Sequence, residues 1–360
     1  MDLTDRKLLN LIQSRFPLVD QPYQALGQEL GPGFAILDEA EVIQRLGELK
    51  RQNVLRQISA IFDTRRLGYK TTLVALAYAP ERLHQGALVI NRHPGVSHNY
   101  AREGSYYNLW FTLAVPPEED LAATVARMAQ DTQALTCRVM PTIRFFKIGV
   151  NFDMVQQKSD AYNFRPDGNG ENGEGEGMDQ GWNQAAPVSE ADKAVIRELQ
   201  EDLPLESRPF DAMARRLGMT TSQLFSLAQQ FQERKIMRRY SAVLHHRRSG
   251  FRANAMIVWK VPEEQSQEMG LKMSQHPAVT HCYQRPTFPD WPYTHFTMVH
   301  ATTPEGCEEA ARQIGEATGI SDRLLLYSTR EYKKTRVRYF VSDYEEYREA
   351  EEEAVPVGDG

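Results

Sequence analysis

The sequence predicts an α+β protein, built as a tandem duplication of a winged helix-turn-helix unit followed by a ferredoxin-like βαββαβ domain. Three observations lead to this prediction. The chain has 360 residues, more than one domain of ordinary size requires. Its first and second halves match in order and spacing, and the apolar residues of each half change from helical to strand periodicity along the chain.

The duplication rests on matched segments that keep nearly constant offsets. Order and spacing are preserved over most of each half, so each half is one structural unit and the chain is a covalent pseudo-dimer. The clearest matches are 53–68 (NVLRQISAIFDTRRLG) with 235–250 (KIMRRYSAVLHHRRSG), 93–102 (HPGVSHNYAR) with 276–285 (HPAVTHCYQR), and 142–147 (TIRFFK) with 328–333 (STREYK).

Each copy is predicted to begin with three short helices. Apolar residues at i, i+3 and i+4 predict them over 3–13, 21–30 and 37–52, with Thr4 and Asp38 as N-caps. A β-branched run at 54–63 follows as a strand, which completes the winged helix-turn-helix. The ferredoxin-like order then predicts strand, helix, strand, strand, helix and strand over 71–79, 80–92, 95–102, 107–115, 118–130 and 134–149.

Composition divides the chain further. The stretch RPDGNGENGEGEGMDQGWNQ lies near the middle and has too few apolar residues to join a core, so it predicts a flexible linker. The predicted domains are 1–64 (helix-turn-helix), 65–155 (ferredoxin-like), 156–187 (linker), 188–246 (second helix-turn-helix), 247–345 (second ferredoxin-like) and 346–360 (acidic tail).

Charge and cysteine content exclude several classes. With 42 basic and 48 acidic residues, the net charge of −6 disfavours a surface made wholly for nucleic acid. Cys137, Cys282 and Cys307 form no CxxC pair and no zinc spacing, which indicates a reducing compartment. No apolar run approaches a membrane span and the N-terminus is charged, so we expect a cytoplasmic protein that does not cross a membrane.

The predicted recognition helices are poor in positive charge. The first, over 38–51, carries four acidic against three basic residues, and the second, over 220–232, carries no charge. Because DNA reading needs cations and hydrogen-bond donors near the phosphates, these helices disfavour DNA as a partner.

A polar motif interrupts the expected alternation of the ferredoxin-like domain. Period-2 geometry puts His98, Tyr100 and Arg102 on one face of a predicted strand, and the second copy repeats them as His281, Tyr283 and Arg285. An imidazole, a phenol and a guanidinium side by side suit an anionic ligand of aromatic size.

The two-part copy resembles the Lrp/AsnC regulators, in which an HP-x-V turn also opens the second strand. The stretch HNYAREGSYYNLWFT (98–112) is more specific and is similar to the sirohaem decarboxylases, the branch of that group that acts on tetrapyrroles. The resemblance implies loss of carbon dioxide from the C12 and C18 acetates of sirohaem, giving 12,18-didecarboxysirohaem for haem d1 or an alternative haem pathway. It also implies two homologous subunits, which are fused in this chain. Whether the fused chain forms a homodimer or pairs with a homologous two-subunit decarboxylase is left open.

The expected chemistry assigns roles to the paired residues. Sirohaem carries eight carboxylates and is its own electron sink, so no cofactor beyond this iron-tetrapyrrole substrate is expected. We expect His98, His281, Tyr100 and Tyr283 to donate protons or to orient the acetate. Alternatively, either histidine is an axial ligand of the substrate iron. No other metal site is expected. Substrate-binding candidates are Arg102, Arg285, Arg144, Lys147, Arg330, Lys333, Asn108 and Trp110.

Two rival functions remain open from the residues alone: a DNA-binding regulator with a small-molecule effector, and a haem-binding sensor without turnover. The copies also differ, since EGSYYNLW corresponds to PTFPDWPYTH, which aligns Asn108 with Tyr293 and Trp110 with His295. His245, His246, His295 and His300 have no counterpart in the first copy. These differences leave open that one copy catalyses the reaction while the other serves mainly as a scaffold.

Overall fold

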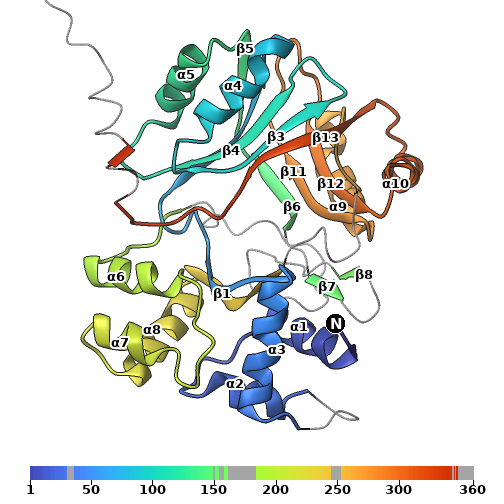
Figure 1. Cartoon of the computed structure of the whole chain (residues 1–360). Coiled ribbons are helices and arrows are strands. Elements are labelled where there is room, and N and C mark those ends of the chain that lie inside the picture. The colour runs from blue at the N-terminus through green and yellow to red at the C-terminus, as the bar shows by residue number, and fades with distance from the viewer. Residues whose placement is uncertain are drawn as a thin grey trace, which may run out of the picture. The chain divides into compact units, whose positions relative to one another are not determined.

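The computed structural model describes residues 1–30, 36–148, 151–153, 158–160, 184–244, 253–342, 344, 346 and 347. The chain forms two compact units, each drawing on both copies of the repeat (Figure 1). Unit 1 contains Met1–Leu67, Ile148–Arg252 and Ala301–Thr303, and unit 2 contains Gly68–Lys147, Ala253–His300 and Pro304–Gly360. Like domains of the two copies therefore associate with each other, as expected of a pseudo-dimer.

Unit 1 holds the two helix-turn-helix copies. Its elements are α1 (Leu3–Ser14), α2 (Pro22–Gln28), α3 (Glu39–Arg51), β1 (Leu55–Phe62), β7 (Asn151–Asp153), β8 (Lys158–Asp160), α6 (Glu190–Leu199), α7 (Asp211–Arg216), α8 (Thr221–Glu233) and β9 (Met237–Leu244).

Unit 2 holds the two ferredoxin-like copies. Its elements are β2 (Lys70–Ala77), α4 (Pro80–Ile90), β3 (Val96–Glu103), β4 (Leu109–Val115), α5 (Leu121–Asp131), β5 (Thr136–Met140), β6 (Arg144–Ile148), β10 (Ala253–Trp259), the 3₁₀ helix η2 (Glu263–Gln265), α9 (Ser266–Gln275), β11 (Val279–Gln284), β12 (His295–Ala301), α10 (Pro304–Thr318) and β13 (Arg323–Lys334).

The two helix-turn-helix copies are joined by their wings. Strand β1 pairs antiparallel with β9, with Ser59 opposite Ser241 at the centre of the ladder. Helix α1 begins at Leu3 as predicted, but its N-cap is Asp2 and not Thr4, and Asp5 completes the capping box. Asp38 caps α3 as predicted. The predicted winged helix-turn-helix is confirmed in both copies.

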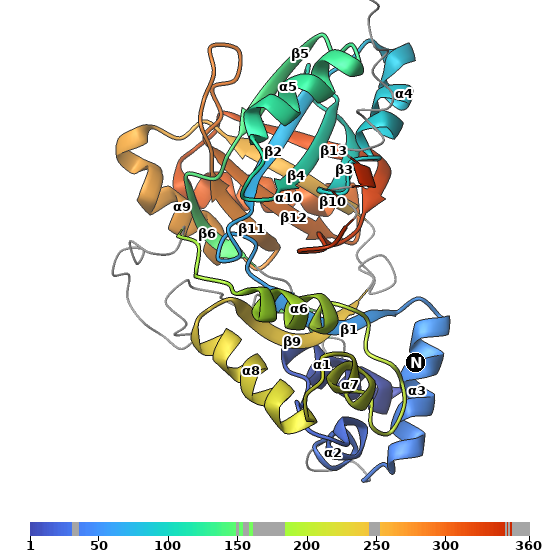
Figure 2. The ribbon, with the colours of Figure 1, turned by 90° about the vertical axis from the view of Figure 1, so that its left-hand side faces the viewer.

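The ferredoxin-like copies share one nine-stranded sheet with the order β5-β2-β4-β3-β13-β10-β12-β11-β6 (Figures 1 and 2). Within it, β5-β2-β4-β3 and β13-β10-β12-β11 each show the 4-1-3-2 order of a βαββαβ domain. The predicted duplication and fold class are confirmed. The predicted domain limits stay predictions.

The last strand of each copy differs from the prediction. We expected one strand over 134–149, but the run divides into β5, which pairs with β2, and β6, which lies at the far end of the sheet beside β11 of the other copy. Pro141 lies at the break, and a proline cannot donate to a ladder. The matching β13 pairs with β10 through its first half and with β3 of the other copy through its second half. The copies thus exchange strand ends.

Two cores lie on opposite faces of this sheet. In the first copy, the helix-covered face packs Val74, Leu76 and Phe111 against α4 and α5. The other face carries a core drawn from both copies, with Ala75 and Trp110 from the first and Val258 and Phe296 from the second. We call this second surface the helix-free face. Because its core contains residues of both copies, the two helix-free faces pack against each other.

A polar contact at the rim of this shared core ties the copies together. The Tyr107 hydroxyl donates to an Asp290 carboxylate oxygen over 2.6 Å, and Arg138 binds the other oxygen of Asp290 at 3.0 Å. Trp291 packs edge-on against Tyr107 and, tilted, against Trp110. The loop inserted in the second copy is therefore part of the interface between copies.

Matched lysines fasten the exchanged strand ends. Lys333 Nζ donates to the backbone oxygens of Asn91 and His93 at 2.9 and 3.1 Å, where α4 of the first copy ends. Lys147 Nζ donates to the backbone oxygen of His276 at 3.5 Å, where α9 of the second copy ends. A cation at a helix C-terminus also interacts favourably with the helix dipole. Each copy thus supplies the lysine that closes a helix of the other.

Some predicted features lie outside the described residues. These are most of the linker 156–187, nearly all of the tail 346–360, and His245 and His246. Among the described residues, no helix is long and apolar enough to cross a membrane.

Replacing Lys333 by Met tests the fastening role. We expect the free energy of unfolding to fall by about 1–3 kcal/mol, because two backbone oxygens lose a charged donor. Arg330→Met on the same strand is the control, since Arg330 is exposed and its loss should change stability by less than about 0.5 kcal/mol. Chemical denaturation measures both, and equal effects would contradict the role.

Candidate functional site

The predicted His-x-Tyr-x-Arg motif of the first copy lies on β3. The side chain of Asn99 donates to the backbone oxygen of Ala87 at 3.1 Å and to Asn91 at 2.9 Å, so it faces α4. Because side chains alternate along a strand, His98, Tyr100 and Arg102 point to the helix-free face. The predicted common face of these three residues is confirmed.

The second copy repeats the arrangement on β11. Cys282 points to α9, where its thiol lies 3.6 Å from the backbone oxygen of Gly270. His281, Tyr283 and Arg285 therefore share the helix-free face as well. Burial raises the pKa of the Cys282 thiol, so a reactive thiolate beside His281 is disfavoured.

Within each motif the rings form a ladder. The ring centroids of His98 and Tyr100 are 6.4 Å apart, and the Arg102 guanidinium carbon lies 5.3 Å from the Tyr100 centroid. In the second copy the His281–Tyr283 distance is 6.1 Å, and the guanidinium of Arg285 lies 5.1 Å from the Tyr283 centroid. The tyrosine is held between an imidazole and a cation in both copies.

The two arginines are buried, with 7% and 8% of Arg102 and Arg285 exposed. Each donates to a backbone oxygen in the last strand of the other copy, Arg102 to Leu326 at 3.0 Å and Arg285 to Met140 at 2.5 Å. Among the described residues, Arg102 has no carboxylate partner and its Nε has no hydrogen bond. Burial lowers the pKa of Arg102 to about 10. A negatively charged ligand beside this guanidinium would stabilise its charged form.

A further imidazole, missed by the sequence analysis, adds to this site. Residues alternate along β12, where Phe296 and Met298 pack in the shared core, so His300 points to the helix-free face. Burial, together with the charges of His281, Lys334 and Arg102, lowers the pKa of His300 to about 3. We had set His300 aside because the first copy has no counterpart. Its period-2 spacing from Phe296 was the available signal.

Four of the predicted substrate-binding residues lie elsewhere. Arg144 is partly buried and donates to Gln267 near the start of α9 at 3.2 Å. Arg330 pairs in register with Ala101, which shares the helix-covered face with Asn99, and is exposed. Lys147 and Lys333 fasten helix ends, as described above. The structure does not bring these four together with the two motifs, and their role as carboxylate ligands stays a prediction.

Asn108 and Trp110 occupy different settings. The Asn108 side chain donates to the backbone oxygen of Tyr78 at 2.7 Å and accepts from its amide at 2.9 Å, so it closes the end of β2. Trp110 is buried in the shared core, and its indole donates to the backbone oxygen of Tyr107 at 2.9 Å. Trp110 thus shares the face of the two motifs, and Asn108 has a backbone role. Substrate binding by either remains a prediction.

The register corrects the alignment of the two copies. Tyr100 lies opposite Trp110, whereas Tyr283 lies opposite Phe296, so Trp110 corresponds to Phe296 and not to His295. In the same way the amide of Arg102 donates to Asn108, whereas that of Arg285 donates to Thr294. The predicted matches with Tyr293 and His295 are therefore wrong by one residue, because the inserted loop is one residue longer than the alignment assumed.

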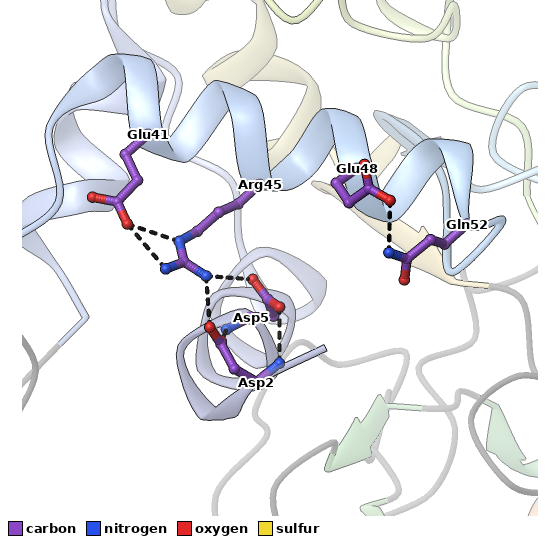
Figure 3. Close-up of polar contacts among 6 residues, drawn as sticks. All are labelled: Asp2, Asp5, Glu41, Arg45, Glu48 and Gln52. Atoms are coloured by element: carbon purple, nitrogen blue, oxygen red, sulfur yellow. Dashed lines mark hydrogen bonds and ion pairs between the residues drawn. The ribbon is translucent and has the colours of Figure 1, made fainter.

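The first recognition helix offers no free cation to a nucleic acid at its centre. Arg45 of α3 binds Asp2 at 2.8 Å, Asp5 at 2.9 Å and Glu41 at 3.0 Å (Figure 3). Glu48 on the same helix accepts from Gln52. Asp5, Glu41, Arg45, Glu48 and Gln52 line a surface pocket between α1 and α3, where carboxylates outnumber cations. The network stabilises the helix-turn-helix and disfavours phosphate contacts.

Metal ligands do not gather in the described parts of the chain. No cluster of three or more His, Cys, Asp or Glu side chains with metal-binding geometry occurs among them.

Family models match the chain in both copies. One, described as "AsnC-like ligand binding domain", matches residues 66–147 and 248–333. The other, described as "Siroheme decarboxylase NirDL-like HTH domain", matches residues 5–56 and 192–238. Together they cover both predicted domain types twice.

The chain matches relatives of its own length and relatives of about half its length. The chain is 37% identical over 342 residues to "Siroheme decarboxylase" of Hydrogenobacter thermophilus, covering 95% of this chain and 96% of that protein. It is 44% identical over 151 residues to "Siroheme decarboxylase beta subunit" of Methanosarcina barkeri, covering 42% of this chain and 99% of that one. The half-length match is what a fused pair of homologous units predicts.

A solved structure resembles the whole chain. It is the siroheme decarboxylase NirDL in co-complex with an iron-uroporphyrin III analogue, with a TM-score of 0.73 and 32% identity over 98% of this chain and 99% of that one.

Buried neutral histidines predict an acid-sensitive unit 2. Burial lowers the pKa of His93 to about 3 and that of His295 to about 4, both below the ordinary 6.5. The unfolded chain therefore takes up protons first, so stability is full above pH 6.5 and falls as the pH drops toward 4.

His295→Asn should reduce the slope of unfolding free energy against pH by up to about 1.4 kcal/mol per pH unit between these limits. Denaturant titrations at several pH values measure it. Identical slopes for the variant and the parent chain would refute the neutral buried state of His295.

Proposed function

Since the chain belongs to the sirohaem decarboxylase family, we propose that it removes carbon dioxide from the C12 and C18 acetate groups of sirohaem. The product is 12,18-didecarboxysirohaem, an intermediate of haem d1 or alternative haem biosynthesis. The observation that carries the proposal is the Arg102 guanidinium, which is buried without a carboxylate partner among the described residues. A ligand with many carboxylates meets this demand.

The binding proposal follows from chemistry on the helix-free face. Sirohaem is flat, conjugated and polyanionic, so it needs aromatic surface and fixed positive charge. The motifs supply Tyr100 and Tyr283 beside Arg102 and Arg285, and guanidinium groups bind carboxylates in a bidentate manner. The solved relative in complex with an iron-uroporphyrin III analogue supports a macrocyclic ligand.

The reaction itself needs little from the protein beyond orientation and a proton. The bond between the acetate methylene and its carboxyl carbon breaks, carbon dioxide leaves, and the electron pair enters the conjugated macrocycle. The methylene carbon then takes a proton and becomes a methyl group. His98 and His281 are the proposed proton donors, with Tyr100 and Tyr283 orienting them or the acetate. An axial bond from either histidine to the substrate iron is the alternative role.

The proposal requires no cofactor beyond the iron-tetrapyrrole substrate, since the macrocycle accepts the electrons. Partners are likewise proposed to be limited to sirohaem and to further copies of this chain or a homologous decarboxylase. DNA is not proposed as a ligand, because the cation at the centre of α3 is paired with carboxylates.

Anaerobic incubation of the purified chain with sirohaem tests the activity. We expect mass spectrometry to show a product that has lost two carbon dioxide units per macrocycle. Binding without a change of mass would identify a haem-binding sensor, and no binding would refute the tetrapyrrole assignment. A salt-dependent complex with DNA would instead support a regulator.

Replacing His98 and His281 separately by Ala tests the proton donors. We expect at least one variant to lose about 10²–10⁴-fold in kcat, the usual contribution of a positioned acid. Mono- and didecarboxylated products, followed over time, show which acetate is affected. Full activity in both variants would refute the assignment.

Arg102→Met separates binding from folding. We expect affinity for sirohaem to fall about 10–100-fold, because one charged hydrogen-bonding partner is lost. The free energy of unfolding should change by less than about 1 kcal/mol, since loss of the bond to Leu326 is offset by removal of a buried charge. Unchanged affinity would contradict the carboxylate-binding role.

A further inference from the structure

A β-bulge lies at the histidine of each motif. Val96 packs under the helices and Asn99 also faces α4, although regular alternation would put residues three apart on opposite faces. The register of the β3–β4 ladder shifts between Val96 and His98, which makes Ser97 the extra residue of a bulge. Ser97 and His98 therefore both point to the helix-free face. The β11–β12 ladder has the same shift before His281.

The bulge brings a buried hydroxyl to the histidine in both copies. The Oγ of Ser97 lies 3.1 Å from Nδ1 of His98, and the Oγ1 of Thr280 lies 3.1 Å from Nδ1 of His281. Only 8% of Ser97 and 1% of Thr280 are exposed. Both copies therefore place a hydroxyl at the same ring nitrogen, although the residue type differs.

A second contact of Thr280 fixes the direction of its hydrogen bond to His281. The Thr280 hydroxyl donates to the backbone oxygen of Met298 at 3.2 Å, and a hydroxyl has one proton to give. Both contacts are satisfied only when the hydroxyl oxygen accepts the hydrogen on Nδ1 of His281. In the neutral ring the lone pair is then on Nε2.

In the first copy a side chain takes the place of that backbone oxygen. The Ser97 hydroxyl lies 2.8 Å from the Thr112 hydroxyl, and Thr112 occupies the position of Met298. When Ser97 donates to Thr112, it accepts from Nδ1 of His98, as in the second copy. Two hydroxyls can also donate in the opposite direction, so this histidine is held less strictly than that of the second copy.

The structural histidine of the HP-x-V turn has the opposite arrangement. Nδ1 of His276 accepts from the backbone amide of Ala278 at 3.2 Å, and Nε2 lies 3.0 Å from the side-chain oxygen of Gln313. Its neutral ring therefore carries the hydrogen on Nε2. The first copy repeats the Nδ1 contact. His276 and His281 thus have opposite tautomers within one copy.

A threonine beside a histidine does not by itself produce the arrangement of Thr280. The Oγ1 of Thr294 lies 3.0 Å from Nδ1 of His295, but Nε2 of His295 lies 2.9 Å from the backbone oxygen of Ser266. Because a backbone oxygen only accepts, this ring has its hydrogen on Nε2. The direction therefore depends on the further partner of each pair.

We propose that Ser97 and Thr280 are positioning residues that hold Nδ1 of the adjacent histidine, so that Nε2 is the atom that each motif histidine presents to the substrate. This inference rests on the proposed function and names the reacting atom within it. As an acid, the protonated ring gives the proton on Nε2 to the methylene carbon and regains one from water, while Nδ1 keeps its hydrogen. As an axial ligand, the neutral ring gives the lone pair of Nε2 to the substrate iron. The same hydroxyl contact serves both roles.

Nitrogen NMR of the full chain with labelled histidine tests the tautomer without substrate, and His281→Ala assigns the signal. At a pH where neutral rings predominate, we expect His281 to carry its hydrogen on Nδ1 and His276 to carry it on Nε2. Thr280→Val removes the hydroxyl and keeps the shape of the side chain, so His281 should lose its preference for Nδ1, whereas Thr280→Ser should keep it. A hydrogen on Nε2 of His281 in the parent chain, or equal populations of both tautomers, would overturn the inference.

Turnover of sirohaem tests the positioning role. Wherever His281→Ala lowers kcat, we expect Thr280→Val to lower it about 10–100-fold, and Ser97→Ala should do the same wherever His98→Ala does. The KM should change little, because the hydroxyl orients the ring and does not touch the substrate. Thr280→Ser and Ser97→Thr restore the hydroxyl and should recover most of the activity.

Thr297→Val is the matched control. Thr297 is a buried residue of the same ladder, and its hydroxyl accepts from the indole of Trp259 at 3.0 Å and donates to the backbone oxygen of Ile257 at 3.3 Å. It lies between Phe296 and Met298 in the strand and so points to the helix-covered face. The variant also loses two hydrogen bonds, but it should keep the parent kcat and the tautomer measured for the motif histidine.

The outcomes separate the two proposals. If the parent chain does not decarboxylate sirohaem, the proposed function fails, and the tautomer measured without substrate still tests the hydrogen bond. If the parent chain is active but Thr280→Val and Ser97→Ala retain full kcat, the positioning role is overturned. An equal loss of kcat in Thr297→Val, or no recovery in Thr280→Ser and Ser97→Thr, would overturn it as well.

Discussion

The exchange of strand ends between the two ferredoxin-like copies is the constraint on which the rest of unit 2 depends. Because β13 pairs with β10 through its first half and with β3 through its second, it joins the four-stranded sheets of the two copies into one. The same strand carries Lys333 to the end of α4 and presents the Leu326 oxygen to Arg102. The position of β13 therefore determines the strand pairing between the copies, the contact at the end of α4 and the position of Arg102 together. Because the copies are covalently fused, β13 always comes from the second copy.

Burying a positive charge destabilises a protein unless an anion or several hydrogen bonds stabilise the charge. Arg102 has only part of that stabilisation. Arg102 is held by one backbone oxygen and one tyrosine ring, with burial lowering its pKa to about 10. A purely structural arginine would be expected to have a carboxylate beside it. The carboxylates of a polyanionic macrocycle would stabilise this guanidinium. Desolvation of Arg102 therefore lowers the stability of the free protein and raises its affinity for such a substrate.

Duplication allowed the two halves to diverge. In the helix-turn-helix units, Arg45 of α3 is paired with three carboxylates, so a helix of DNA-reading type serves to pack its own domain. In the ferredoxin-like units, the motif residues are kept in both copies, whereas His300 occurs in one. The fold thus retains its pseudo-twofold geometry while some side chains at matched positions of the helix-free face differ.

The sequence alone determined the architecture and the central motif, because both rest on short-range patterns. Offsets between repeats revealed the duplication, helical and strand periodicities ordered the elements, and alternation placed His98, Tyr100 and Arg102 on one face. It did not determine where the last strands pair, since a run such as 134–149 carries no mark of the partner it joins across the sheet. For the same reason nothing in the sequence indicated that Lys147 and Lys333 close helices of the other copy. His300 was discounted for lacking a repeat partner, and only the tertiary structure showed that it points to the helix-free face with Phe296 and Met298.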